Sequence, residues 1–441
     1  MSAEGYALTP HMYLAVSILL GAYAFIFSEI MHRTSAAIVG AVVMVGVGTA
    51  AGFYSQEAAV LSIDANTLFL LLAMMLLVAI IRPTGGFEYI GIKLAKIAGG
   101  NPRRLLVYLS LAVSVLSMFL DNVTTVLIFA PLTVLITRML NLNPAPYLIA
   151  EAMLSNVGGA ATLVGDPPNI MIGSSAGFDF YSFLTHMGPV IAPVWTGTIL
   201  LMFFLFRDDL RSENGSSYNV DLDEGKAISD KAGLWRASFA LAVVIVLFFV
   251  HHQLHLFPAY VAWIGLAIAL LLSKPDPETL MAQVEWSTLL FFAALFIIVG
   301  GVEASGLLEL VGQLLAESAR NPDTILFSAL TLMWVAALLS AMVDNIPFTV
   351  TMIPIVAGLE TQGINVNSLW WALAIGVGLG GNATHIGATA NIICIAEAER
   401  SRHPKARITP LQWMRVGIPV MLVSLALASS IFAWSFSRFM R

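Results

Sequence analysis

The stretch Ser117–Ile170 holds two polar clusters inside an otherwise apolar run, SMFLDNVTT at 117–125 and SNVGGAATLVGDPPNI at 155–170. Both clusters recur about half a chain later. The first returns at an offset of 223 residues, which pairs Ser117, Asp121, Asn122 and Pro131 with Ser340, Asp344, Asn345 and Pro354. The second returns at an offset of 222, which pairs Gly158, Gly159, Thr162, Gly165, Asn169 and Ile170 with Gly380, Gly381, Thr384, Gly387, Asn391 and Ile392. Two homologous halves that each carry two helix-breaking polar patches are typical of a secondary transporter with its site at the repeat interface.

The composition indicates an all-α polytopic membrane protein. A soluble domain carries about 25% charged residues, whereas this chain of 441 residues is 11% charged and 58% hydrophobic. Apolar runs long enough to span a bilayer recur along the whole chain, and the short alternating strands of a β-barrel are not seen. The single Cys394 excludes a disulfide framework within the chain and any all-cysteine metal site. We expect no cofactor and no resident metal, no nucleic-acid partner and no enzyme activity.

The apolar pattern predicts about ten spans and two hairpins. We expect simple spans at 11–29, 35–53, 66–82, 187–206, 234–251, 257–273, 286–300 and 414–437, and broken spans at 145–176 and 367–396. The segments 104–139 and 323–358 are bent at Asp121-Asn122 and Asp344-Asn345, so we expect each to form a re-entrant hairpin. Non-helical backbone at such depth requires burial in protein or a watery cavity. Segments 84–98 and 302–318 are predicted to be linking helices at the interface.

The distribution of charge predicts the topology in the cell (inner) membrane. With both termini outside, 18 of the 21 basic residues fall on the cytoplasmic side, all except Arg320, Arg438 and Arg441. The halves 1–206 and 234–441 then each hold an odd number of spans, which predicts an inverted repeat. The hydrophilic segment 207–233 is predicted to be a cytoplasmic linker. We find no nucleotide-binding loop in the chain, which leaves a separate ATPase partner as an open alternative.

Asp121 and Asp344 are the strongest functional candidates. A charged Asp at mid-bilayer costs about 2.5–3.5 kcal/mol on insertion scales, so two at matched positions need a reason. Each could simply cap a broken half-helix, since Asp is a good N-cap. Capping and proton exchange are compatible roles for one carboxylate. The polar neighbours that we expect to line the same pocket are Asn122, Thr124, Thr125, Asn345 and Thr349.

The glycine pairs predict unwound turns in the two broken spans. Gly158-Gly159 and Gly380-Gly381 would free backbone groups and direct half-helix dipoles into a site from both halves. Close packing of helices through small residues is the alternative interpretation. The flanking polar residues Asn156, Thr162, Asn169, Asn382, Thr384 and Asn391 favour a site.

Two further titratable residues break the repeat. Asp166 corresponds to Ala388, and it precedes Pro167-Pro168 as an N-cap would. His385 corresponds to Leu163 and could relay protons, although a lone membrane His is more often a packed, hydrogen-bonded residue. The proton-coupling candidates are therefore Asp121, Asp344, Asp166 and His385.

The motif stretches contain carboxylates and amides but no cations. Residues 117–131, 155–170, 340–354 and 377–392 include three Asp, six Asn and no Lys or Arg. A multiply charged anion usually recruits a cationic clamp, so a cation or a small neutral polyhydroxy solute fits this lining better.

Four stretches resemble the ion-transporter superfamily, in the branch of arsenite permeases, sodium/proton antiporters and the melanosomal P protein. They are FLDNVTTVLIFAP (119–131), SNVGGAATLVGDPPNIMIG (155–173), SAMVDNIPFTVTMIP (340–354) and GLGGNATHIGATANIICIAEAE (378–399). The resemblance implies a scaffold domain, a transport domain that moves as an elevator, and a homodimer. Dicarboxylate/sodium symporters of the wider superfamily carry Ser-Asn-Thr where this chain has Asp121-Asn122 and Asp344-Asn345, which disfavours a sodium–dicarboxylate function.

The expected function is export of arsenite or antimonite in exchange for protons. Arsenite is a neutral trihydroxide near neutral pH, which Asn, Thr and protonatable Asp groups could hydrogen-bond. Sodium/proton antiport and a chloride-like anion pathway are the second and third interpretations. A non-transporting scaffold or receptor would give the duplicated carboxylates no task.

Overall fold

The computed structural model describes residues 8–28, 30–211, 224–310, 324–342, 345–401 and 407–440. Helices make up the regular structure of these ranges, and no strand occurs in them. Eight of the helices are at least 18 residues long and apolar enough to cross a membrane. The predicted fold class, an all-helical multi-pass membrane protein, is confirmed.

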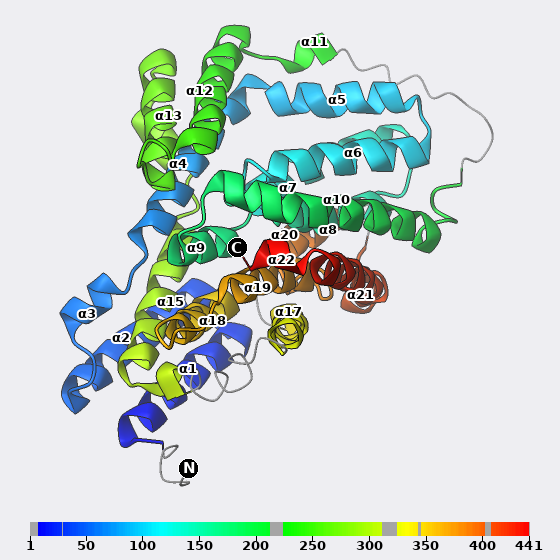
Figure 1. Cartoon of the computed structure of the whole chain (residues 1–441). Coiled ribbons are helices and arrows are strands. Elements are labelled where there is room, and N and C mark those ends of the chain that lie inside the picture. The colour runs from blue at the N-terminus through cyan, green and yellow to red at the C-terminus, as the bar shows by residue number, and fades with distance from the viewer. Residues whose placement is uncertain are drawn as a thin grey trace.

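One set of helices, which we call the peripheral group, runs along the left of Figure 1. Its members are α1 (Pro10–Ser28), α2 (Arg33–Ala51), α3 (Gln56–Leu61), α4 (Ala65–Ile81), α12 (Lys231–Val250), α13 (Pro258–Ser273), α14 (Pro277–Met281) and α15 (Trp286–Ala304). Within it, α2 packs between α1 and α15, and α4 packs against α12 and α13. The predicted simple spans 11–29, 35–53, 66–82, 234–251, 257–273 and 286–300 all fall on these helices.

The remaining long helices form what we call the central group, most of which lies to the right in Figure 1. Its members are α6 (Pro102–Ser117), α7 (Asn122–Met139), α8 (Ala145–Gly159), α9 (Pro167–Ala176), α10 (Phe180–Leu205), α17 (Ile325–Met342), α18 (Asn345–Glu360), α19 (Asn367–Gly380), α20 (Thr389–Arg400), α21 (Pro410–Trp434) and α22 (Phe436–Phe439). Both predicted hairpins and both predicted broken spans lie in this group, each divided into two helices near the expected break.

Short elements connect the two groups in the first half of the chain. A 3-10 turn, η2 (Arg82–Thr84), leads into α5 (Gly86–Ala98), the predicted linking helix at 84–98. Helix α11 (Glu224–Ala227) packs against α5 at the top of Figure 1. The second predicted linking helix, 302–318, is described only as far as residue 310.

Contacts inside the central group occur in equivalent pairs that are related by the sequence repeat. Helix α6 packs on α8 as α17 packs on α19, and α7 packs on α20 as α18 packs on α9. Matching hydrogen bonds join the hairpins to the broken spans: Ser117 Oγ donates to Ser155 O at 2.9 Å, and Ser340 Oγ donates to Val377 O at 3.1 Å. These paired contacts support the predicted repeat, while its inversion and the domain boundaries stay predictions.

Glycine permits the closest of these helix approaches. A Cβ atom on Gly158 would lie 2.4 Å from the carbonyl oxygen of Ser114 on α6. A Cβ on Gly380 would lie 2.4 Å from the carbonyl oxygen of Ala337 on α17. The packing interpretation of these glycines is therefore correct, and it is compatible with their place beside the unwound turns.

Candidate functional site

Four helix N-termini converge where the peripheral and central groups meet. Helices α7, α9, α18 and α20 begin at Asn122, Pro167, Asn345 and Thr389, and all four residues line one small cavity. Its volume of about 20 Å³ for water centres is enough to hold roughly one water molecule. The half-helix ends predicted to point into a site from both halves therefore meet at this cavity.

Three carboxylates and one guanidinium from the described part of the chain line the cavity. Asp121 and Asp166 come from the central group and are 6% and 2% exposed. Glu285 and Arg33 come from the peripheral group. The sequence motifs predicted the two aspartates, whereas the two peripheral residues were missed.

Asp121 is held rigidly as the N-cap of α7. Its Oδ1 accepts a hydrogen bond from the backbone N–H of Thr124 at 2.8 Å, and its Oδ2 accepts one from the Thr124 hydroxyl at 2.5 Å. The capping interpretation is thus correct, and it coexists with a position on the cavity wall. Its repeat partner Asp344 lies outside the described residues.

A chain of amides runs from the cavity into the core and joins the two halves. Asn122 Nδ2 donates to Asn156 Oδ1 at 3.0 Å and lies 3.5 Å from Asp166 Oδ1. Asn156 Nδ2 in turn donates to Asn382 Oδ1 at 2.9 Å and to Asn391 Oδ1 at 3.2 Å. Asn156 therefore links residues that are more than 220 positions apart in sequence.

The repeat-related counterpart of the Asn156–Asn382 contact is formed by small apolar residues. At the repeat offset of 222, Asn156 corresponds to Gly378 and Asn382 corresponds to Ala160. The pair Gly378 and Ala160 also meet, because a Cβ on Gly378 would lie 2.9 Å from the Ala160 Cβ. The contact between α8 and α19 therefore has pseudo-two-fold geometry, with a polar pair on one side only.

Several predicted site residues hold the unwound turns. Asn169 Nδ2 donates to the carbonyls of Gly159 and Thr162, and Asn391 Nδ2 donates to those of Gly381 and Thr384. The hydroxyls of Thr162 and Thr384 donate to the carbonyls of Met118 and Ala341 at the hairpin bends. These side chains satisfy backbone groups that the breaks leave without helical partners, and none of them lines the cavity.

The other predicted residues lie nearby without facing the cavity. Thr349 donates to the Asn345 carbonyl at 2.7 Å, and His385 lies in the turn between α19 and α20. Thr125 Oγ1 and Asn382 Nδ2 are buried without a hydrogen-bond partner among the described residues. Outside the predicted set, Glu151 is fully buried on α8, and one of its oxygens accepts a hydrogen bond from the Thr133 hydroxyl.

Arg33 ties the peripheral group to the central group at the cavity. Its Nη1 donates to the Thr389 hydroxyl at 2.9 Å, and its guanidinium carbon lies 5.3 Å from the centre of the Phe291 ring on α15. The ring partly compensates the half-buried cation through its quadrupole.

Glu285 lies in the loop before α15, outside the spans. Burial and, next, the carboxylate of Asp121 raise the pKa of Glu285, while the hydrogen bond from Thr288 and the Arg33 guanidinium partly oppose the rise. Both peripheral residues sit at span ends, where charged residues normally meet lipid headgroups, so the sequence pattern carried no signal for their role.

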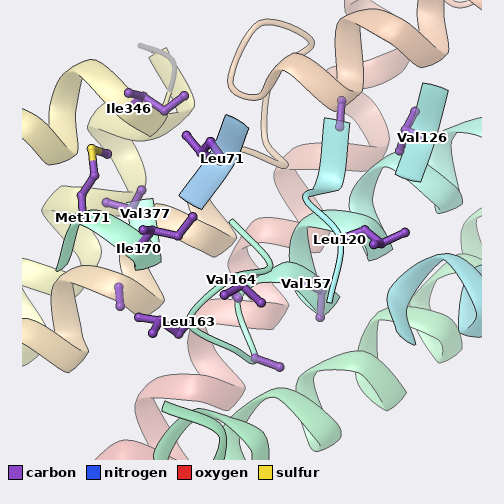
Figure 2. Packing of buried hydrophobic residues seen from close by; sticks show 14 of the residues in the cluster. Leu71, Leu120, Val126, Val157, Leu163, Val164, Ile170, Met171, Ile346 and Val377 are labelled. Atoms are coloured by element: carbon purple, nitrogen blue, oxygen red, sulfur yellow. The ribbon is translucent and has the colours of Figure 1, made fainter. Parts of the chain in front are cut away.

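Apolar side chains exclude bulk water from the surroundings of the cavity. Leu71 of α4 and Ile346 of α18 line it directly, and both are buried. Figure 2 shows these two residues close to one another, with Val157 and Val164 of the first broken span further along the same core. Charges in such a poorly solvated site interact more strongly than in water.

Comparison with known proteins gives consistent matches along the chain. The sequence model of the CitMHS family, described as a citrate transporter, matches residues 23–376. A 46 kDa membrane protein of Mycobacterium leprae is 39% identical over 433 residues, covering 96% of this chain and 98% of that protein. The human P protein is 33% identical, over 93% of this chain and 58% of its own length. The YdaH transporter of Alcanivorax borkumensis has the same fold, with a TM-score of 0.61 at 13% identity over 97% of this chain and 98% of its own.

Proposed function

The chain belongs to the CitMHS citrate transporter family of membrane transporters. We propose that it exchanges protons for a small inorganic solute, arsenite or antimonite. The resemblance to the ion-transporter superfamily and the P protein, inferred from the motifs, is confirmed. The substrate and the coupling are our proposal.

The charge balance of the cavity carries this proposal. Among the described residues, Asp121, Asp166 and Glu285 against Arg33 give three negative charges and one positive charge, a sum of −2 when all four side chains are ionised. Each helix N-terminus adds about +0.5 charge, so the four that line the cavity roughly offset that sum. The described lining is therefore close to electrical balance, and its amide, hydroxyl and carboxyl groups suit a neutral trihydroxide that can both donate and accept hydrogen bonds.

A tricarboxylate is disfavoured as the substrate. Recognition of several carboxylates usually requires bidentate arginines or a comparable clamp. Arg33 is the one cationic side chain on this cavity within the described residues, and it already binds Thr389 and stacks on Phe291. A chloride-like anion would likewise find no cationic side chain other than Arg33 among the described residues of the cavity.

Arsenic would be held by oxygen and nitrogen groups and not by thiolates. Cys394 on α20 is fully buried, and the chain has no second cysteine with which to chelate arsenic. Protons would compete with the solute for the carboxylates, because protonation of Asp121 changes both its charge and its hydrogen-bonding capacity. This competition couples the movement of the solute to the movement of protons.

Sodium/proton antiport is the second candidate, and the size of the cavity favours it. A volume of about 20 Å³ fits a single dehydrated ion more readily than a trihydroxide. Carboxylate and amide oxygens are also the ligands that hard cations prefer. Under this alternative the same carboxylates alternate between sodium and protons.

Movement of the central group past the peripheral group is the transport step that we propose. Within the described ranges, direct contacts between the groups are few and include α4 with α9, α10 with α12 and α15 with α18. The Tyr23 hydroxyl adds a bond of 2.9 Å to the Pro347 carbonyl and one of 2.9 Å to Thr351. An elevator mechanism requires such a small number of breakable contacts.

Transport by purified protein in inside-out vesicles tests the proposal. Arsenite uptake should follow an imposed proton gradient and be indifferent to sodium. Sodium-dependent pH changes in the absence of arsenite would establish the antiporter instead. If neither arsenite nor sodium transport were accompanied by proton movement, proton-coupled exchange would be refuted.

A further inference from the structure

Glu285 stands between the central cavity and a second cavity beside it. The second cavity, of about 40 Å³, is lined by Thr124, Arg82 and Gln283, and it shares Met75 and Glu285 with the central one. Of the two shared side chains, only Glu285 is titratable. A single carboxylate therefore faces both spaces.

Thr124 connects the second cavity to Asp121. Its hydroxyl donates to Asp121 Oδ2 at 2.5 Å, and the same side chain lines the second cavity. A hydroxyl both donates and accepts hydrogen bonds, so it can pass a proton without a net change in its own protonation. Asp121 is thus reached from the second cavity through Thr124, although its own side chain is 6% exposed.

The far end of the second cavity lies at the protein surface. Arg82, at the C-terminal end of α4, and Gln283, in the loop before α15, are both exposed. They belong to the face that also carries Lys274 and the segment 224–233, which the charge distribution predicts to be cytoplasmic. The two cavities together therefore run from the central carboxylates to that face.

Charged groups of both signs surround Glu285. The carboxylate of Asp121, at the start of α7, raises the pKa of Glu285, and the guanidinium of Arg33, on α2, lowers it. Asp166 shares the central cavity, and Arg82 shares the second one. Its Oε2 also accepts a hydrogen bond from Thr288 at 3.1 Å. Two carboxylates in one poorly solvated space disfavour simultaneous ionisation, which favours uptake of a proton by one of the pair.

We propose that Glu285 is a proton-relay residue that carries protons between Asp121 and the aqueous face at Arg82. This inference rests on the proposed function, because it names the route by which that exchange is coupled. In the outward step of the relay, the proton of the Asp121 carboxyl passes through the Thr124 hydroxyl to the Glu285 carboxylate. Glu285 then releases it to water at Arg82, and both carboxyls return to their ionised form.

Two assays on the same reconstituted protein separate a relay from a solute ligand. Exchange of labelled for unlabelled arsenite at equal pH on both sides requires no net proton movement. Uptake driven by a pH gradient, followed with an entrapped pH dye, requires proton movement in every cycle. Glu285→Gln should slow gradient-driven uptake by about a hundredfold, the usual scale for losing a positioned acid–base group, and should slow exchange far less.

Matched variants complete the design. Glu285→Asp keeps a carboxyl and should restore most of the driven uptake. Glu278→Gln removes an exposed carboxylate from the neighbouring helix α14 and should behave like wild type in both assays. Radioactive sodium replaces arsenite in both assays if the wild type prefers sodium.

Each outcome decides between distinct accounts. Loss of both exchange and driven uptake in Glu285→Gln would make Glu285 a solute ligand or a structural residue and would overturn the relay. Unchanged rates in both assays would overturn it as well. A wild-type chain that moves neither arsenite nor sodium against protons would refute the proposed function, and this inference with it.

Discussion

Asp121 shares its local geometry with two other aspartates of the chain. Asp64 caps α4 by accepting from Thr67, and Asp276 caps α14 by accepting from Thr279, each through both the backbone N–H and the hydroxyl. Only Asp121 among these three lies on the central cavity. Its distinguishing property is therefore its surroundings and not its hydrogen bonds.

This comparison provides a matched control for the role of the Asp121 charge. Asp121→Asn removes the charge but keeps an amide oxygen that caps a helix about as well as Asp does. We expect the thermal unfolding temperature in detergent to stay unchanged, while proton-coupled transport falls by about a hundredfold. Asp64→Asn should leave both properties unchanged. Normal coupled transport by Asp121→Asn would show that this carboxylate is only a cap.

Single residues also show where reasoning from sequence succeeds and where it fails. Asp121 and Asp166 were predicted because a carboxylate inside an apolar segment is costly and therefore informative. Arg33 and Glu285 were not, because charges at span ends are expected whatever the function. They reach the cavity through tertiary contacts, because Arg33 of α2 bonds to Thr389 of α20 and α15 packs against α18.

At the scale of elements, the convergence of four helix N-termini depends on the close crossings of the broken spans. Repeat offsets and glycine pairs predicted the breaks, since glycine is disfavoured in a helix interior without a reason. They did not predict that Asn169 and Asn391 would hold the turns, rather than line the site. That distinction depends on side-chain direction, which sequence spacing leaves undetermined.

The crossing of α8 with α6 offers a test of this element-level account. Gly158→Ala would place a Cβ 2.4 Å from the Ser114 carbonyl oxygen, so the helices must separate. We expect a loss of about 1–3 kcal/mol in stability, seen as a lower unfolding temperature in detergent. Gly46→Ala on α2 has nothing within 4 Å of the new Cβ and should be neutral or slightly stabilising. Equal unfolding temperatures for the two variants would contradict the tight crossing.

At the scale of the whole molecule, the charge distribution predicts an orientation in the membrane that can be measured directly. Cys394 is fully buried, so the wild-type chain should react little with membrane-impermeant maleimides. Lys226→Cys on α11 and Leu254→Cys in the loop after α12 are exposed positions on opposite sides of that span. In right-side-out vesicles, we expect labelling at position 254 and protection at position 226. The reverse pattern would invert the predicted topology.

The whole account depends on competition between protons and solute for the same carboxylates. Purified protein in weakly buffered detergent solution should therefore release protons when arsenite or sodium binds, and the pH should fall in proportion to the bound fraction. Asp121→Asn should release markedly fewer protons at the same occupancy. Saturable binding of either solute without any change in pH would contradict proton exchange at this site.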